Sequence, residues 1–156
     1  EGYRADGRCF ANANEYQVDY LKTIFRSPPL QSLSKGVKIN YFMAGPFDFQ
    51  KYIESGQLKL ADDNKVATLE TEVSLYEGQV GGGVGDGLGR EQTTAIKEGQ
   101  FINSKLEGFG RIITESSFFV GSISQGKKHG RGTITFSDGR VQQGIWQNDV
   151  WQEGPK

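Results

Sequence analysis

Glycine recurs at a nearly constant spacing in the second half of the chain, and this recurrence constrains the fold more than any other feature. Gly78, Gly99, Gly121 and Gly144 are separated by 21, 22 and 23 residues. Apolar residues stand at fixed offsets from them: three before are Leu75, Ile96, Phe118 and Val141, and two after are Val80, Phe101, Ile123 and Trp146. Because glycines and apolar residues recur in register, we interpret the region as a repeat array in which neighbouring units complete one another.

Each unit has the pattern of a β-hairpin. Nine residues after the first three glycines come Gly-x-Gly steps, namely Gly87-Leu88-Gly89, Gly108-Phe109-Gly110 and Gly130-Arg131-Gly132. Thr133 to Phe136 then alternate polar and apolar residues, which is typical of a half-buried strand, and Ser137-Asp138-Gly139 supplies a tight turn. A lone hairpin cannot bury its apolar face. We therefore expect the residues two after each glycine to form an apolar ladder along one face of a sheet of successive hairpins.

The first part of the chain has a different composition. Three of the four prolines but only five of the 22 glycines lie before Tyr76. A helix is predicted to start with Asn14 as its capping residue and to end at Ser27-Pro28-Pro29, because proline removes a backbone donor. Its apolar face would carry Val18, Leu21, Ile24 and Phe25.

Between residues 37 and 75 the sequence predicts further strands and one more helix. Val37 to Met43 alternates like a strand, and Phe47 to Ser55 fits a short helix with Gly56 as its C-cap. Residues 58–60 and 67–75 form a second alternating pair across an Asp62-Asp63-Asn64 turn. We therefore predict a mixed α/β segment over residues 1–65, followed by a β array over residues 66–156. Within the first segment, residues 1–13 fit either a degenerate repeat or an ordinary loop.

The array resembles the MORN (membrane occupation and recognition nexus) family. The third unit carries the resemblance best, with Gly121, the run from Lys127 to Gly132, and Phe136-Ser137-Asp138-Gly139. Tyr76-Glu77-Gly78 and Glu98-Gly99-Gln100-Phe101 match in the first two units, so that the resemblance covers about residues 74 to 151. It implies a mainly β fold, an elongated single-layer antiparallel sheet of hairpins. It also implies an interaction or scaffold module of cytoskeletal, ciliary or membrane-apposed assemblies, appended in some members to lipid kinases or methyltransferases.

Several kinds of chemistry find little support in the sequence. The net charge of −1 with mixed signs gives no basic stripe for nucleic acid. The glycine-rich residues 81–89 lack the spacing of a phosphate-binding loop and fit repeat turns better. His129 is the single histidine and Cys9 the single cysteine, so no histidine pair can hold a metal, and only a fold that joins them could make a dyad. Asp62-Asp63-Asn64 lacks calcium-ligand spacing and fits a turn. We expect a non-enzymatic chain without cofactor or metal.

The function predicted from the residues and the resemblance is an intracellular scaffold or interaction subunit that docks a protein within a larger cytoskeletal or membrane-associated assembly. The alternatives are a regulatory region of a larger enzyme, such as a lipid kinase, and a phospholipid-binding module. The chain begins at Glu1 rather than Met, which we interpret as a processed chain or a fragment.

The candidate contact residues follow from strand alternation, which prevents Phe118 and Phe119 from pointing the same way. We predict that the partner-binding residues are Tyr76, Phe119 and Trp151, with Phe101, Phe118 and Trp146 inside. A local basic cluster offers an anionic-lipid contact worth about 1 kcal/mol per cation; its members are Lys127, Lys128 and Arg131. The other interpretation of that cluster is a solvated turn.

The apolar ladder yields a stability prediction. Phe101→Ala and Trp146→Ala should each lower the free energy of unfolding by roughly 3–5 kcal/mol, because each removes a large buried ring. Thermal or urea unfolding of the two variants measures this, and variants that unfold together with the parent protein would show that the ladder is misassigned.

Overall fold

The structure, a computed structural model, describes residues 13–61 and 64–153. Three helices come first: α1 (Ala13–Arg26), α2 (Lys35–Ala44) and α3 (Phe49–Glu54). The strands that follow are β1 (Lys65–Glu70), β2 (Leu75–Gly81), β3 (Val84–Gln92), β4 (Ile96–Ile102), β5 (Lys105–Ile113), β6 (Ser117–Ser124), β7 (Lys127–Phe136), β8 (Val141–Gln147) and β9 (Val150–Glu153).

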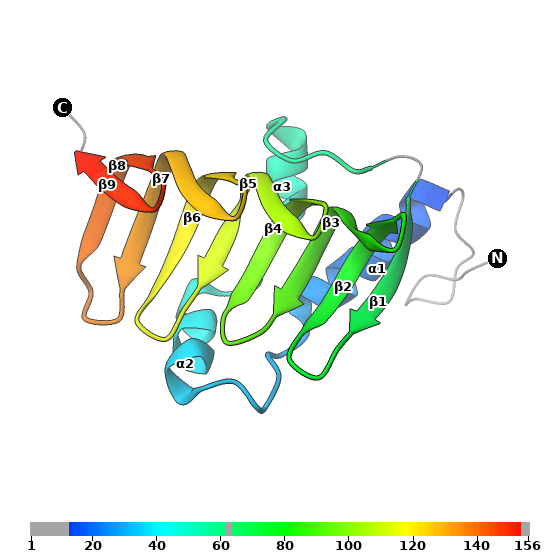
Figure 1. Ribbon diagram of the computed structural model, residues 1–156, viewed down its shortest axis with the longest axis horizontal. Coiled ribbons are helices and arrows are strands. Elements are labelled where there is room, and N and C mark those ends of the chain that lie inside the picture. The colour runs from blue at the N-terminus through cyan, green and yellow to red at the C-terminus, as the bar shows by residue number, and fades with distance from the viewer. Residues whose placement is uncertain (1–12, 62–63, 154–156) are drawn as a thin grey trace.

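The strands form one elongated antiparallel sheet in which strand order equals sequence order (Figure 1). Every strand pairs with its sequence neighbours, so the sheet is a row of hairpins. The predicted fold class, a mainly β array that forms an elongated single-layer antiparallel sheet, is confirmed. The segment before it, predicted as mixed α/β, contains three helices and no strand within the described residues 13–61.

The recurring glycines pair with one another across the sheet. Gly99 lies opposite Gly89 on one side and Gly110 on the other, and Gly121 lies opposite Gly110 and Gly132. With Gly78 and Gly144 at its ends, this makes a continuous row of glycines across seven strands, β2 to β8. A Cβ on Gly99 would lie 2.6 Å from the Cα of Gly110, so the backbones approach too closely for any side chain. Beyond this row the strands curl over one face (Figure 1).

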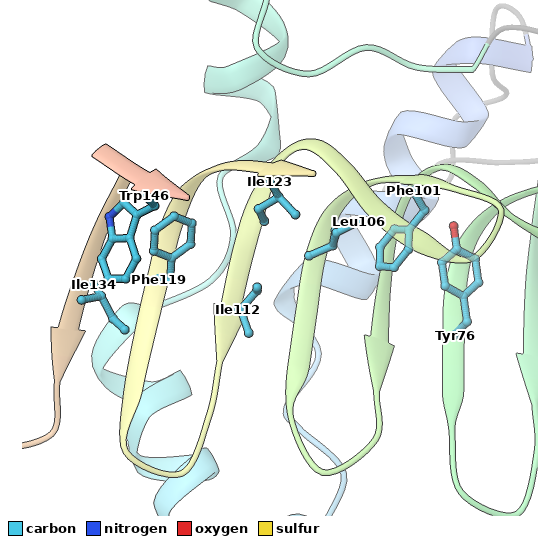
Figure 2. Packing of buried hydrophobic residues seen from close by; sticks show 8 residues of the cluster. All are labelled: Tyr76, Phe101, Leu106, Ile112, Phe119, Ile123, Ile134 and Trp146. Carbon is cyan, nitrogen blue, oxygen red and sulfur yellow. The ribbon is translucent and has the colours of Figure 1, made fainter. Parts of the chain in front are cut away.

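We call the face enclosed by that curl the inner face. It holds an apolar cluster of Tyr76, Phe101, Leu106, Ile112, Phe119, Ile123, Ile134 and Trp146 (Figure 2). Phe101 and Trp146 are 0% and 4% exposed, and Val80 packs against the cluster, so the predicted ladder exists. The side chains interlock between units: the rings of Phe119 and Trp146 meet edge to face with centroids 5.4 Å apart.

The opposite, outer face is covered by the helices over β1 to β6. Leu21 and Phe25 of α1 pack with Leu88 and Phe109 of the sheet. A second outer cluster joins Val37 and Tyr41 of α2 and the preceding Leu33 to Ile96 and Ile113, with Phe118 packed against it. Leu88 and Phe109 are the middle residues of the first two Gly-x-Gly steps, so each step places an apolar group under a helix.

A buried ionic cluster attaches the helices to the sheet. The carboxylate of Glu98, which is 0% exposed, accepts a 2.6 Å hydrogen bond from Arg111 Nε and lies 3.7 Å from Arg90 Nη1. Arg90 also donates to the carbonyl of Ser27, just after α1, at 2.9 Å, and Arg111 donates to Gly45, just after α2, at 2.5 Å. Both arginines therefore complement the negative ends of helix dipoles. Burial raises the pKa of the Glu98 carboxyl, against the opposing effect of the two guanidinium groups.

Tyr41 completes this cluster. Its hydroxyl donates to the carbonyl of Phe25 at 3.0 Å and accepts from Arg90 at 3.1 Å. Arg111 stacks over its ring, 5.5 Å from the centroid. Burial is the main cause that raises the pKa of this phenol. A single side chain of α2 therefore contacts both arginines of the ionic cluster and the end of α1.

The strand predicted at Val37 to Met43 is wrong, because these residues belong to α2. The Ser34 side chain caps the helix by accepting from Val37 N at 3.3 Å, and Val37 and Tyr41, four residues apart, share its buried face. The strand predicted at residues 58–60 is also wrong, since Leu58 and Leu60 lie in coil and β1 pairs directly with β2.

The other two helices are confirmed. α1 ends at Arg26, before the prolines, and Leu21, Ile24 and Phe25 are buried on one face as predicted. Its first residue is Ala13, so that Asn14 lies within the helix and not at its cap. α3 ends at Glu54 with Ser55 as its C-cap, one residue before Gly56. The degenerate repeat proposed for residues 1–13, Cys9, and Asp62 and Asp63 lie outside the described residues, apart from Ala13 at the start of α1.

Replacing the carboxylate of the ionic cluster tests its importance. Glu98→Gln should lower the free energy of unfolding by roughly 3–5 kcal/mol, because two buried arginines lose their counter-charge. Asp138→Asn is the matched control, since Asp138 pairs with Arg140 at an exposed turn and exposed pairs contribute little. Urea unfolding of both variants measures the difference, and equal stability of the two would contradict the assigned role.

A second prediction concerns the glycine row. A Cβ on Gly132 would overlap the ring of Phe119. Gly132→Ala should therefore cost roughly 1–3 kcal/mol of stability. The same substitution should cost less in a Phe119→Leu background, because the ring is absent there. A double-mutant cycle followed by urea unfolding measures this coupling, and equal costs in both backgrounds would exclude the ring contact as the cause.

Candidate protein-binding surface

Two of the three residues predicted to bind a partner are buried. Tyr76 and Phe119 are 5% and 1% exposed, so the prediction that they lie on a free face is wrong. The ring of Tyr76 meets that of Phe101 at 5.1 Å, and its hydroxyl donates to the carbonyl of Gln79 at 2.6 Å. Burial is the main cause that raises the pKa of this phenol far above its ordinary value. Strand alternation already places Tyr76 on the same face as Val80, four residues further along, although it does not show how deeply that face is buried.

Trp151, the third predicted contact, remains half-buried at the end of the array. It packs against the inner cluster, and its indole N–H donates to the carbonyl of Gln143 at 3.3 Å. The prediction that Phe118 lies inside with Phe101 and Trp146 is wrong, because Phe118 lies on the outer face, packed against the cluster under α2. Phe118 and Phe119 therefore point to opposite faces, as strand alternation requires.

The predicted basic cluster is divided between the two faces. Lys128 lies on the inner side, with its ammonium 5.8 Å from the ring centroid of Phe119, 5.7 Å from that of Trp146, and 3.5 Å from an oxygen of Asp149. Arg131 is exposed and pairs across strands with Ile145 of the outer face. Lys127 is exposed at the start of β7. The three cations therefore do not share one flat surface.

An exposed apolar ridge runs along α2. Ile39, Phe42 and Met43 are 47%, 86% and 53% exposed, and their spacing of three and four residues places them together on the exposed surface of the helix. The ridge is not predicted from the sequence, because residues 37–43 alternate like a strand. The capping residue Ser34 followed by apolar residues at helical spacing was the signal that could have revealed it.

A second exposed apolar area lies on the outer face at the C-terminal end of the sheet. Val141, Ile145 and Val150 are 57%, 40% and 60% exposed. Val141 and Ile145 alternate along β8, and Val150 pairs with Gln147, two residues beyond Ile145. These residues therefore share the outer face of β8 and β9.

The groups that could be mistaken for a reactive site have structural roles. His129 is exposed, and its Nδ1 accepts from the backbone N–H of Asn148 at 3.3 Å. The glycine-rich residues 81–89 form the hairpin of β2 and β3, with Gly82 and Gly83 at its turn in positive-φ conformations. Within residues 13–61 and 64–153, no three side chains of the metal-binding types cluster. A Cys9–His129 dyad lies outside the described residues because Cys9 does.

A hollow of about 330 Å³ between α1 and α3 is lined by Lys22, Phe25, Arg26, Pro46, Phe47, Asp48, Phe49 and Gln50. Its volume is at the lower end of small-ligand sites. Its charged and polar residues are exposed, apart from the half-buried Lys22, and only its phenylalanines are buried. The hollow therefore offers no buried polar group that would orient a ligand.

Two hairpins of the sheet match a known protein family. The profile of the MORN repeat matches residues 98–114 and 119–139, which are the hairpins β4–β5 and β6–β7. The chain contains MORN repeats. No curated protein matches the sequence. MORN repeats are found in interaction and membrane-binding modules. None of the helices in the described ranges has the length and hydropathy required to cross a membrane.

Proposed function

We propose that this chain is a non-catalytic interaction subunit whose MORN sheet and attached helices dock a protein partner within a larger intracellular assembly. The exposed ridge of Ile39, Phe42 and Met43 on α2 carries the proposal. Phe42 is 86% exposed, and its removal from water by a partner would lower the free energy of the complex. Contiguous exposed apolar residues typically mark interaction sites.

The remaining structure supports a binding role in preference to a catalytic one. The buried ionizable groups Arg90, Glu98 and Arg111 bond to one another and to helix ends, so their charges hold the fold together. The aromatic rings of the inner face pack against one another. The partner is either a subunit of a cytoskeletal or membrane-apposed assembly or, as the alternative form of this proposal, a catalytic domain that this chain regulates.

Phospholipid binding is the competing function. The cations that would contact an anionic surface lie on different faces of the sheet, and Lys128 is held by Asp149 and two aromatic rings. Only a few cations would reach the plane of a membrane, and each would contribute about 1 kcal/mol to the free energy of binding. The protein-docking function is therefore favoured by the positions of both the apolar and the basic residues.

Replacing the ridge tests the proposal. The double variant Phe42→Gln/Met43→Gln should lose the proteins that the parent chain captures from a lysate of its source cells, measured by quantitative mass spectrometry and repeated with the purified partner. Val73→Gln is the matched control, because Val73 is 80% exposed in the β1–β2 turn and should leave capture unchanged.

Two outcomes would contradict the proposal. In the first, the ridge variant captures the same proteins as the parent chain. In the second, the chain sediments with anionic vesicles in a salt-sensitive manner that is lost on neutralising Lys127, Lys128 and Arg131, while protein capture is absent.

A further inference from the structure

The helical layer on the outer face stops before the sheet does. α1 packs against β1, β2 and β3, and α2 packs against β5 and β6. Among the described helices, Figure 1 shows none behind β8 and β9. The outer face of β7 to β9 therefore leaves Val141, Ile145 and Val150 exposed beside a covered surface of the same sheet.

Comparison of the repeats shows what would cover this area. Val141 occupies the position held by Ile96 and Phe118 in the two preceding units, three residues before the glycine. Both of those residues pack in the cluster that α2 covers. In the fourth unit the position is still apolar, but the side chain is 57% exposed. The repeat thus presents a helix-packing residue without a helix.

One outer-face position of the repeat changes from apolar to basic along the array, and this change indicates the charge of an element that would pack there. Leu88 and Phe109, which lie under helices, correspond to Arg131 in the third unit. Arg131 is exposed directly beside Ile145, and none of the described carboxylates forms an ion pair with it. An element that packs on Val141 and Ile145 would therefore bring its own carboxylate to Arg131.

α2 lies beside the exposed outer face of β7 to β9. Asn40 donates to the Ser137 hydroxyl, in the β7–β8 turn, at 3.1 Å, so this flank of α2 faces the end of the sheet. Met43 is three residues beyond Asn40 and four beyond Ile39, so the side chains of Ile39 and Met43 border the flank on which Asn40 lies. Three strands span about 10 Å, because neighbouring strands lie about 4.8 Å apart. One helix has a diameter of about 10 Å. The exposed strip next to α2 therefore has room for a single helix.

We propose that the corner between α2 and the outer face of β7 to β9 binds an amphipathic α-helix of a partner protein. The apolar residues of this helix would contact Val141 and Ile145 on the sheet and Ile39 and Met43 on α2. Its carboxylates would pair with Arg131. The helix continues the layer that α1 and α2 begin. This inference rests on the proposed docking function and specifies the class of partner and the place where it binds.

The test selects helices without assuming a partner. A displayed library of helical peptides about 18 residues long, or about 27 Å, is selected against the full 156-residue chain. We expect enriched peptides with apolar residues at three- and four-residue spacing beside Asp or Glu. Fluorescence anisotropy of a labelled enriched peptide should show about tenfold or greater loss of affinity for Val141→Ser/Ile145→Ser. Ile102→Ser, which changes a residue 52% exposed at the end of β4, is the matched control and should bind normally.

A charge reversal keeps the test independent of folding defects. Arg131→Glu should lose affinity for the acidic peptide. It should instead bind the same peptide when lysines replace the acidic residues. A folded variant that gains the second peptide cannot owe its loss of the first to unfolding.

Four results would overturn the proposal. They are the absence of enriched helices, enriched helices indifferent to Val141, Ile145 and Arg131, binding of this surface to phosphatidylserine vesicles in place of peptides, and a self-associated dimer that Val141→Ser/Ile145→Ser dissociates. Any of these results, together with capture that still depends on Phe42 and Met43, would leave the docking function standing and reject only the helix and its site.

Discussion

The close approach of backbones along the glycine row is the constraint on which the structure depends. Gly99 and Gly121 have glycine partners on both sides, and a side chain at either position would collide with the neighbouring strand. Beyond the row the strands curl over one face, and this curl lets a single-layer sheet enclose Phe101, Phe119 and Trp146 without a second sheet. The apolar core of the array thus follows from residues that have no side chains.

The residues on the outer face of the sheet differ from unit to unit, and with them the contacts to the helices. Where the middle residue of the Gly-x-Gly step is Leu88 or Phe109, the next residue after the step is Arg90 or Arg111, and these arginines bond to carbonyls beyond α1 and α2. The third unit has Arg131 and Thr133 at these positions. Both residues lie in β7, beyond the strands β5 and β6 on which α2 packs. The glycines set the shared backbone, and the variable positions determine which units hold a helix.

The sequence predicted the hairpins and the inner ladder because glycine spacing and strand alternation are local properties. It failed at Val37 to Met43, whose apolar residues fit a period of two as well as a helix. The helix is decided by the cap at Ser34 and by distant contacts, such as that of Asn40 with Ser137. The prediction of the partner-binding residues was wrong for a related reason. The curl deepens the inner face enough to bury Tyr76 and Phe119 together with the ladder, and alternation alone does not reveal that depth.

The identity of strand order and sequence order also bears on cooperativity. Each hairpin contacts mainly its immediate neighbours, so the free energy of local opening can differ along the array. β1 to β6 are coupled to residues 13–61 through the helices, whereas β7 to β9 are held mainly by one another, by β6 and by the inner cluster. Amide hydrogens at the C-terminal end should accordingly exchange through opening events that leave the rest of the sheet intact. An occupied outer face would couple those strands to the remainder and turn a graded unfolding into a single transition.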